Sequence, residues 1–124
     1  VWRNRRLVVE KFRPEREGDY YCLRQWIFLG DRGVSQRLVS LNPIVKFPNE
    51  VHREYGPPVP SSLREMRSRL GFDYGKFDYV VVDGEVILLD ANRTPALGVS
   101  DGWAQNMAAE LAGGLPSFLR GLDD

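Results

Sequence analysis

The segment KFDYVVVDGEVILLD, residues 76–90, restricts the possible folds of this chain more than any other segment. Two apolar runs rich in β-branched residues flank the dipeptide Asp83-Gly84, which is typical of the turn in a β-hairpin. A two-residue loop would put Asp78 and Asp90 on opposite faces of this hairpin. A three-residue loop over Val82–Gly84 with a bulge would put them on the same face. The sequence allows both registers.

Three β-rich segments precede the hairpin, separated by polar or glycine-containing breaks, and they predict an antiparallel meander. The break Gly30–Gly33 is a tight turn between the second and third segments. A loop of either two or four residues there places Arg24 and Arg37 on the same face of the sheet. The three segments are Leu7–Arg13, Tyr20–Leu29 and Val34–Leu41.

Two helices are predicted outside the β-rich segments. Five of the eight prolines fall within residues 42–60, so we expect an irregular connection there, without a long helix or a central strand. After it, Ser62 with Glu65 three residues later predicts a capped helix of about ten residues that ends at Gly71. The run WAQNMAAELAG near the C-terminus predicts the second helix, followed by a short helical piece.

These elements predict one α+β domain over residues 1–124, a mostly antiparallel sheet with helices packed on one side. A chain of 124 residues, 43% of them hydrophobic, can bury a core without disulfides. No apolar run approaches the roughly 18 to 20 residues that cross a bilayer, and no signal-peptide pattern is present, so we expect a soluble, cytoplasmic protein. One cysteine and one histidine exclude a Cys/His zinc site, and we expect Cys22 in the core.

Charge is unevenly distributed along a chain whose net charge is zero. Residues 1–70 carry 14 Lys and Arg against 8 Asp and Glu, whereas residues 71–124 carry 3 against 9. This asymmetry argues against a uniform nucleic-acid-binding surface. It fits a site where cationic side chains meet phosphates while carboxylates hold a metal, but it fits better two halves that simply attract each other.

The end of the hairpin carries the strongest candidate for chemistry. Asp90 and Asn92 are two residues apart on a strand, so their side chains share a face. Asp78 interrupts an otherwise apolar run on the preceding strand, where an unpaired charge is costly. Oxygen ligands of this kind suit Mg²⁺. Alternatively, Asp78 is an edge charge, and Asp90 with Asn92 only turns the chain.

Three segments resemble ATP-grasp enzymes, in the same order along roughly residues 7–112. GFDYGKFDYVVVDGEVILLDANRTP looks like the metal-binding end of that family, and LVVEKFRPERE is similar to its adenine-contacting hinge strand. DYYCLRQWIFLGDRGVSQR resembles a strand pair in its glutamate-adding and glutathione-forming branches. The sequence departs from the family at Asp90, where Glu is usual, and at Ala96, where Gly is common. The chain resembles the C-terminal part of a larger ATP-grasp domain.

This resemblance implies an ATP- and magnesium-dependent carboxylate–amine ligase that acts through an acyl phosphate. Its partners would be small-molecule carboxylate and amine substrates and the missing N-terminal part of the same enzyme. The alternative is a nonenzymatic binding or interaction module that keeps the fold. The resemblance assigns adenine contact to Glu10, Lys11 and Arg13, and ribose contact to Glu17 with Asp19 as a substitute. It assigns Mg²⁺ binding to Asp78, Asp90 and Asn92. It assigns the stabilisation of phosphate oxygens to Arg24 and Arg37.

Overall fold

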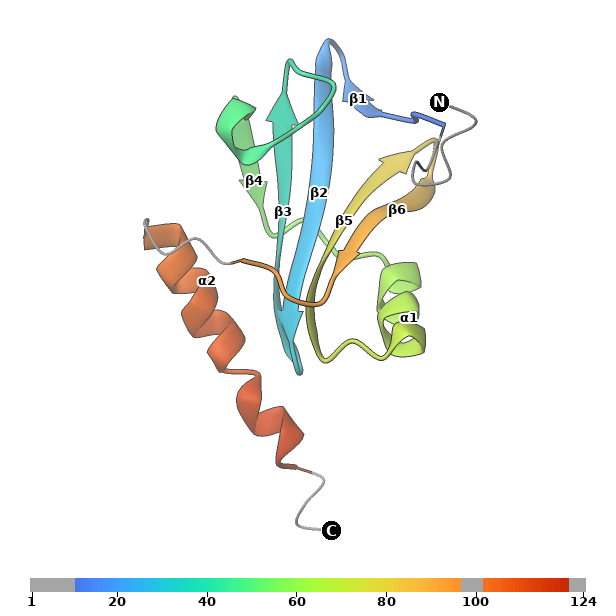
Figure 1. The fold of residues 1–124 in the computed structure, drawn as a ribbon. Coiled ribbons are helices and arrows are strands. Elements are labelled where there is room, and N and C mark those ends of the chain that lie inside the picture. Colours follow the sequence, from blue (N-terminus) through green and yellow to red (C-terminus); the bar gives the residue numbers. More distant parts are fainter. Residues whose placement is uncertain (1–10, 97–101, 121–124) are drawn as a thin grey trace, which may run out of the picture.

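The computed structural model describes residues 11–96 and 102–120, which form an antiparallel sheet with a helix on each face (Figure 1). Over these residues the sheet has six strands in the order β4-β3-β2-β5-β6, and β1 pairs with β2. The predicted α+β class with a mostly antiparallel sheet is thus confirmed. The strands are β1 (Glu15–Glu17), β2 (Tyr20–Leu29), β3 (Arg32–Ser40), β4 (His52–Tyr55), β5 (Tyr74–Val82) and β6 (Glu85–Asn92). The α-helices are α1 (Ser61–Leu70) and α2 (Gly102–Ala112), and two short 3₁₀ helices are η1 (Phe47–Asn49) and η2 (Leu115–Phe118).

The meander is confirmed for its second and third strands. β2 has the predicted bounds, and β3 begins two residues earlier than predicted because Leu29 pairs with Arg32 across a two-residue turn. Arg24 pairs directly with Arg37, so the two arginines share a face as predicted. Of the predicted strand Leu7–Arg13, residues 7–10 lie outside the described residues, and residues 11–13 are not in a strand.

The proline-rich segment is less irregular than predicted. It contains η1 and the edge strand β4, which pairs with Gln36–Val39 of β3. The prolines flank β4 rather than interrupt it, which is compatible with an edge strand. Helix α1 then begins at Ser61, with Pro60 as its N-cap and no side-chain cap, so the predicted capping by Ser62 is wrong. The helix ends as predicted at Gly71, whose φ of 67° fits a left-handed C-cap.

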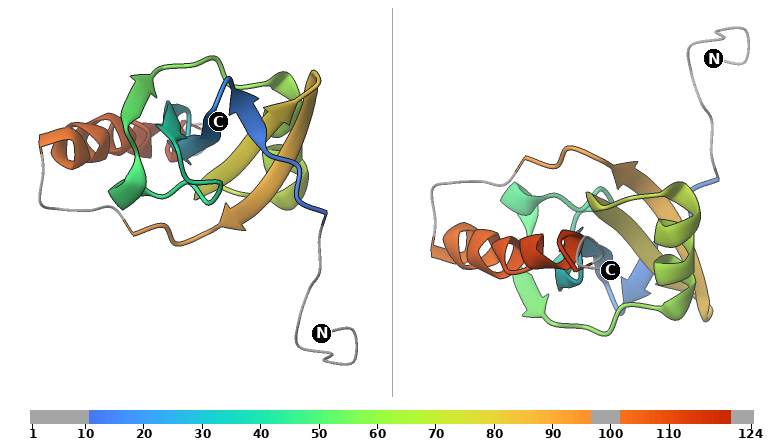
Figure 2. Two further views of the ribbon diagram at one scale, coloured as in Figure 1. Left: turned by 90° about the horizontal axis from the view of Figure 1, so that it is seen from above. Right: turned by 90° about the horizontal axis from the view of Figure 1, so that it is seen from below.

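The prediction that both helices pack on one side of the sheet is wrong, because β2 is apolar on both faces. Trp26 and Phe28 point to the face covered by α1, where Leu63 of α1 joins them in the core. Ile27 points to the other face and packs against Met107 and Leu111 of α2. Each apolar face therefore needs its own helix. Figure 2 shows α1 and α2 on opposite sides of the sheet. We call these faces the α1 face and the α2 face.

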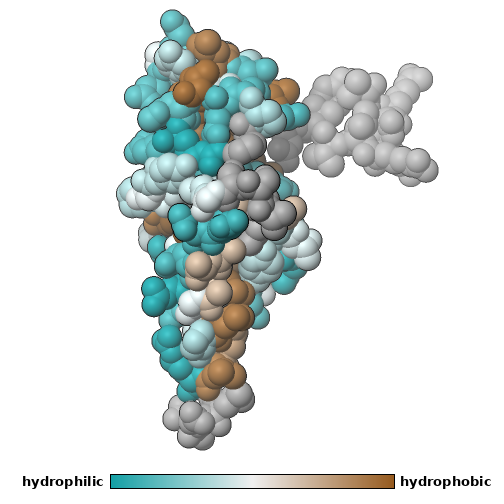
Figure 3. All heavy atoms as spheres, turned by 90° about the vertical axis from the view of Figure 1, so that its left-hand side faces the viewer, coloured by the Kyte–Doolittle hydropathy of each residue, from teal (hydrophilic) through white to brown (hydrophobic). Residues whose placement is uncertain are grey.

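Apolar residues also remain exposed at the C-terminal end of the described chain. Leu115, Phe118 and Leu119 are all exposed, and Figure 3 shows apolar side chains gathered at the end of the molecule where α2 and η2 lie. Neither helix has the length and apolar character needed to cross a membrane, judged over residues 11–96 and 102–120.

Candidate functional site

The hairpin of β5 and β6 has a two-residue loop. Val82 pairs with Glu85, so only Asp83 and Gly84 form the turn, and both have positive φ (51° and 75°), as a type I′ turn requires. The three-residue loop, which the metal hypothesis demanded, is therefore wrong. A regular ladder continued from this turn would place Asp78 and Asp90 on opposite faces.

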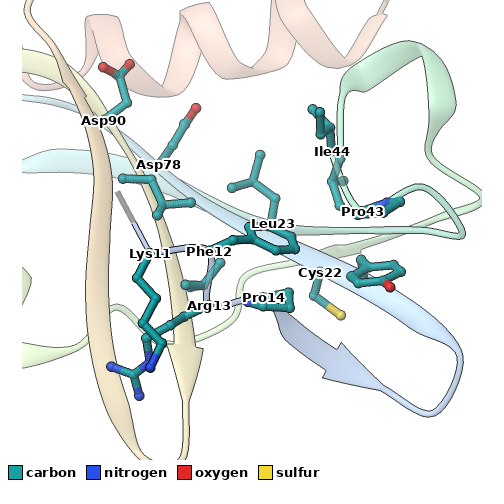
Figure 4. A pocket seen from close by; sticks show the side chains of 14 residues that line it. Lys11, Phe12, Arg13, Pro14, Cys22, Leu23, Pro43, Ile44, Asp78 and Asp90 are labelled. Carbon is teal, nitrogen blue, oxygen red and sulfur yellow. The ribbon is translucent and has the colours of Figure 1, made fainter. Parts of the chain in front are cut away.

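A bulge farther along the hairpin reverses that outcome. Tyr79 pairs with Leu88, whereas Asp78 pairs with Asp90, so Leu89 is the extra residue of a β-bulge. The two carboxylates are thus direct cross-strand neighbours on one face. Figure 4 shows them pointing in the same direction from adjacent strands. The predicted convergence of Asp78 and Asp90 is confirmed, although a different irregularity produces it.

The carboxylate pair lies at the side of a mostly apolar pocket of about 370 Å³ on the α2 face. Leu23 and Val80 line the pocket beside Asp78, and Ile44 from the proline-rich segment stands across from Asp78 (Figure 4). A concave apolar site with a few converging polar groups is the usual form of a small-molecule site. Four residues from the predicted site line this pocket, namely Lys11, Arg13, Asp78 and Asp90.

Asp78 is held in an unfavourable environment for a charged carboxylate. Its side chain is 19% exposed, and its Oδ1 atom is buried and accepts no hydrogen bond within the described part of the chain. Lys76 Nζ lies 3.5 Å from Oδ1, close enough for an ion pair but without hydrogen-bond geometry. Burial raises the pKa of the Asp78 carboxyl; Lys76 opposes this shift and the nearby Asp90 carboxylate adds to it.

Asp78 and Asp90 end a row of polar side chains that crosses four strands. Gln36 pairs with Gln25, Gln25 pairs with Asp78, and Asp78 pairs with Asp90. Gln36 Nε2 donates to Gln25 Oε1 at 2.6 Å, but Gln36 Oε1 is buried without a donor among the described residues. Neither glutamine was predicted from the sequence as a site residue. The available signal was their position next to Arg24 and Arg37, which puts them on the opposite face of the same two strands.

Arg24 and Arg37 lie on the α1 face, with the sheet between them and the carboxylate pair. Arg24 pairs with Tyr79, whose ring belongs to the core beneath α1. The arginines converge on the buried Glu15: Arg24 Nε donates to Glu15 Oε2 at 2.9 Å, and Arg37 Nε donates to Glu15 Oε1 at 3.3 Å. Both predicted catalytic residues are therefore neutralised on the face opposite to Asp78 and Asp90.

Glu15 links its own strand, β1, to three other strands of the sheet. Besides the two arginines, its Oε2 accepts the backbone N–H of Val81 in β5 at 2.9 Å. Burial alone would raise the pKa of Glu15, but these hydrogen bonds and the charges of Arg24 and Arg37 lower it overall. The Glu15 network thus connects β1, β2, β3 and β5 through one buried carboxylate whose oxygens accept hydrogen bonds from the protein.

The remaining predicted residues are dispersed. Glu17 pairs with Arg37 at 2.7 Å on the α1 face, and Asp19 is exposed in the turn after β1. Arg13 Nη1 pairs with Glu85 at 2.7 Å, and Asn92 Oδ1 accepts the backbone N–H of Thr94. Glu10 lies outside the described residues. The structure therefore does not gather the predicted adenine and ribose contacts into one cluster.

Cys22 has the predicted character of a core residue. It is buried and forms no disulfide, and burial raises the pKa of its thiol. A thiol with a raised pKa is a poor nucleophile at neutral pH.

The carboxylate pair offers a partial ligand set for a hard cation. In the parts of the chain that the structure describes, no group of three or more His, Cys, Asp or Glu side chains is arranged to hold a metal ion. Asp78 and Asp90 instead provide two carboxylates, one with a donor-free oxygen. Mg²⁺ typically takes one or two protein carboxylates and completes its shell with water and substrate phosphates. The donor set fits that mode.

Comparison of the chain with models of protein families, with characterised proteins and with solved structures gave no match.

Proposed function

We propose that this chain forms the magnesium-binding part of the nucleotide site in an ATP-dependent carboxylate–amine ligase of the ATP-grasp type. The observation that carries the proposal is the direct pairing of Asp78 with Asp90 beside an apolar pocket. Two like charges placed side by side at a pocket wall are unfavourable, and Lys76, which lies 3.5 Å from Asp78, can balance only one of them. The β-bulge at Leu89 creates this arrangement, and without it the two side chains would point apart.

The chemistry of the donors supports magnesium. Carboxylate oxygens are ligands that Mg²⁺ prefers, and the donor-free Oδ1 of Asp78 would gain a partner on binding. Asn92 shares the face of Asp90, but its Oδ1 already accepts a hydrogen bond from Thr94, so we assign it a supporting role. A bound Mg²⁺ would neutralise charge on the nucleotide phosphates.

The pocket wall supports an aromatic base as the neighbouring ligand group. Leu23, Ile44 and Val80 present apolar surface beside the carboxylate pair. Lys11 and Arg13, in the segment before β1, line the same pocket, which supports contact between this segment and the nucleotide. The positions of Arg24 and Arg37 favour a structural role, so we assign the stabilisation of an acyl phosphate to other residues of the complete ATP-grasp domain.

A specific observation also favours a second candidate, a binding module without ligase chemistry. Arg24 and Arg37 are both engaged by glutamates on the far face of the sheet. A module that binds a nucleotide or a cation needs no such arginines, whereas phosphoryl transfer depends strongly on positioned cations. Both candidates use the same Asp78–Asp90 pair.

The first experiment measures Mn²⁺ binding, with Mn²⁺ as a paramagnetic substitute for Mg²⁺. Electron paramagnetic resonance gives the fraction of free Mn²⁺ for the purified chain with and without ATP. We expect Asp78→Asn and Asp90→Asn each to weaken binding by about tenfold or more, because one of two charged ligands is lost. Asp83→Asn is the matched control, since it removes the same charge at the other end of the hairpin and Asn tolerates the positive φ found there.

Equal affinities for the three variants would contradict a metal site at the carboxylate pair.

A measurement of turnover distinguishes the two candidate functions. A protein that carries this chain with the N-terminal part of an ATP-grasp domain should release phosphate from ATP only when acid and amine are both present. Metal and nucleotide binding without such release, across a panel of acids and amines, would favour the binding module.

A further inference from the structure

A second cavity, of about 460 Å³, lies beside the turn between β2 and β3 and is lined by residues of both α1 and α2. Its floor is formed by Trp26 and Ser35, which pair across the two strands, and its walls come from Pro57, from Arg64 and Arg67 of α1, and from Glu110 of α2. The Asp78–Asp90 pair lies on the face of the sheet opposite to Trp26. The proposed magnesium site therefore does not include this cavity.

Small residues on β3 keep the cavity open. Gly33 lines it, and a Cβ atom at this position would lie 2.8 Å from Trp26 Nε1, too close for any larger residue without movement of the ring. Ser35 Oγ donates a hydrogen bond to the Pro57 carbonyl at 2.6 Å, which fixes the proline wall against the sheet. The space between Trp26 and Pro57 is thus bordered by a strand and by a proline that is hydrogen-bonded to that strand.

Two guanidinium groups from α1 are held at this cavity. Arg67 Nε donates to the Phe72 carbonyl at 2.8 Å, and its Nη2 donates to the carbonyls of Gly30 at 2.8 Å and Asp73 at 3.2 Å. The Arg67 guanidinium also stacks on the Phe28 ring at 4.1 Å, and that of Arg64 lies 5.1 Å from the centre of the Trp26 ring. Arg67 is therefore fixed before any ligand arrives, which lowers the entropic cost of binding, whereas the exposed Arg64 lies over the Trp26 ring.

These two guanidinium groups have no carboxylate partner in the described structure. The cavity also contains Asp31, Arg32 and Glu110, but Glu110 pairs with Arg32 at 3.5 Å and Asp31 pairs with Arg120 at 2.7 Å. Within residues 11–96 and 102–120, no carboxylate lies within ion-pair distance of Arg64 or Arg67. Burial lowers the pKa of the Arg67 guanidinium; the charge of Asp73 opposes this shift, and the positive charge of Arg64 adds to it.

We propose that this cavity binds the oxyanion group of a small molecule, a phosphate or a carboxylate, between Arg64 and Arg67. The Arg64 guanidinium can donate two parallel hydrogen bonds to either oxyanion, and such charge-assisted bonds are stronger than neutral ones. Arg67, whose Nε and Nη2 donate to backbone carbonyls, would contribute its Nη1 and its positive charge. Pro57 and the Trp26 ring would contact the apolar body of the ligand. An anion there would supply the missing counter-charge.

The experiment follows the indole N–H signal of Trp26 by ¹⁵N NMR while the protein is titrated with inorganic phosphate. Sodium chloride holds the ionic strength constant, and acetate replaces phosphate in a parallel titration. We expect a saturable shift with at least one of the two anions. The anion that binds more tightly identifies the ligand as phosphorylated or as a carboxylic acid.

Two variants test the position of the site. Arg64→Gln should weaken anion binding by about tenfold or more, because a charge-assisted hydrogen bond is lost. Arg69→Gln removes the same charge from an exposed position of the same helix outside the cavity, so the affinity should stay within about twofold. A circular dichroism spectrum of each variant shows whether α1 remains folded.

Failure to reach saturation with both anions would overturn the proposal. Equal weakening by Arg64→Gln and Arg69→Gln would also overturn it, because that result indicates general charge attraction. Asp78→Asn should leave anion binding unchanged, so the outcome is independent of the proposed magnesium site.

Discussion

The two faces of the sheet use acidic residues in opposite ways. On the α1 face, the buried Glu15 accepts hydrogen bonds from two arginines and a backbone N–H. On the α2 face, Asp78 stands beside another carboxylate, Asp90, and one of its buried oxygens has no hydrogen-bond donor among the described residues. The difference shows which charges hold the fold together and which remain available to a ligand.

The pKa shifts of these two buried carboxyls express the same contrast. The pKa of Glu15 is lowered overall despite its burial, whereas burial raises that of Asp78. A carboxyl with a lowered pKa stabilises the folded state when charged, and one with a raised pKa destabilises it. We therefore expect substitution of Glu15 and of Asp78 to change stability in opposite directions.

The largest effect is expected for Glu15→Gln. It leaves Arg24 and Arg37 half-buried without their shared counter-ion, and we expect a loss of about 3 kcal/mol in the free energy of unfolding. Glu17→Gln is the control, because Glu17 is exposed and its loss leaves Arg37 paired with Glu15, so the loss in the free energy of unfolding should stay below about 1 kcal/mol. Urea unfolding measures the change in the free energy of unfolding for both variants. Similar losses for the two variants would mean that Glu15 does not organise the network.

A smaller effect of opposite sign is expected for Asp78→Asn. In the absence of metal, removing this buried charge should raise the free energy of unfolding by about 1 kcal/mol at neutral pH. As the pH rises from the ordinary Asp pKa of about 4 through the raised value in the folded state, the Asp78 carboxyl contributes a growing penalty. The advantage of the variant should therefore be absent in acid and complete above that range.

The contribution of Glu15 has the opposite pH dependence. It is fully present above the ordinary Glu pKa and is lost as the pH falls through the lowered value in the folded state. Urea unfolding over a series of pH values measures both curves, with each variant compared against the original chain. Parallel curves for the Glu15 and Asp78 variants would contradict the distinction between the two faces.

The smallest effect concerns Tyr79, whose hydroxyl is buried on the α1 face without a hydrogen-bond partner in the described structure. Tyr79→Phe removes this unsatisfied group and keeps the ring that packs beneath α1. We expect a change in the free energy of unfolding between zero and a gain of about 1 kcal/mol. A loss of more than about 1 kcal/mol would show that the hydroxyl belongs to the Glu15 network after all.

The elements that depend on local signals were predictable from the sequence. The Asp83-Gly84 turn, β2 with its bounds and the end of α1 at Gly71 each follow from neighbouring residues. The bulge at Leu89 was not predictable, since nothing in the run VILLD distinguishes the residue without a cross-strand partner. This one residue decides whether Asp78 and Asp90 lie on the same face. Local sequence patterns do not determine the strand register to within one residue.

The candidate site was only partly predictable for a related reason. The alternation of side chains along β2 and β3 correctly placed Arg24 and Arg37 on one face of the sheet. It could not show whether Asp78 lies on that face, because the pairing of β2 with β5 joins segments that are distant in the sequence. The role of Glu15 depends on the same long-range pairing. The residue types that can bind a phosphate were identified, whereas their partners required the three-dimensional structure.

A thermal unfolding comparison of the original chain with Asp78→Asn, with and without MgCl₂ and ATP, decides whether the Asp78–Asp90 pair is a ligand site. Without metal, Asp78→Asn should be the more stable of the two, because it lacks the buried like charge. At saturating magnesium and ATP, the original chain should become the more stable, since a ligand that binds only the folded state stabilises it. If magnesium and ATP leave the order of the two melting temperatures unchanged, the carboxylate pair does not hold the metal and the proposed function is wrong.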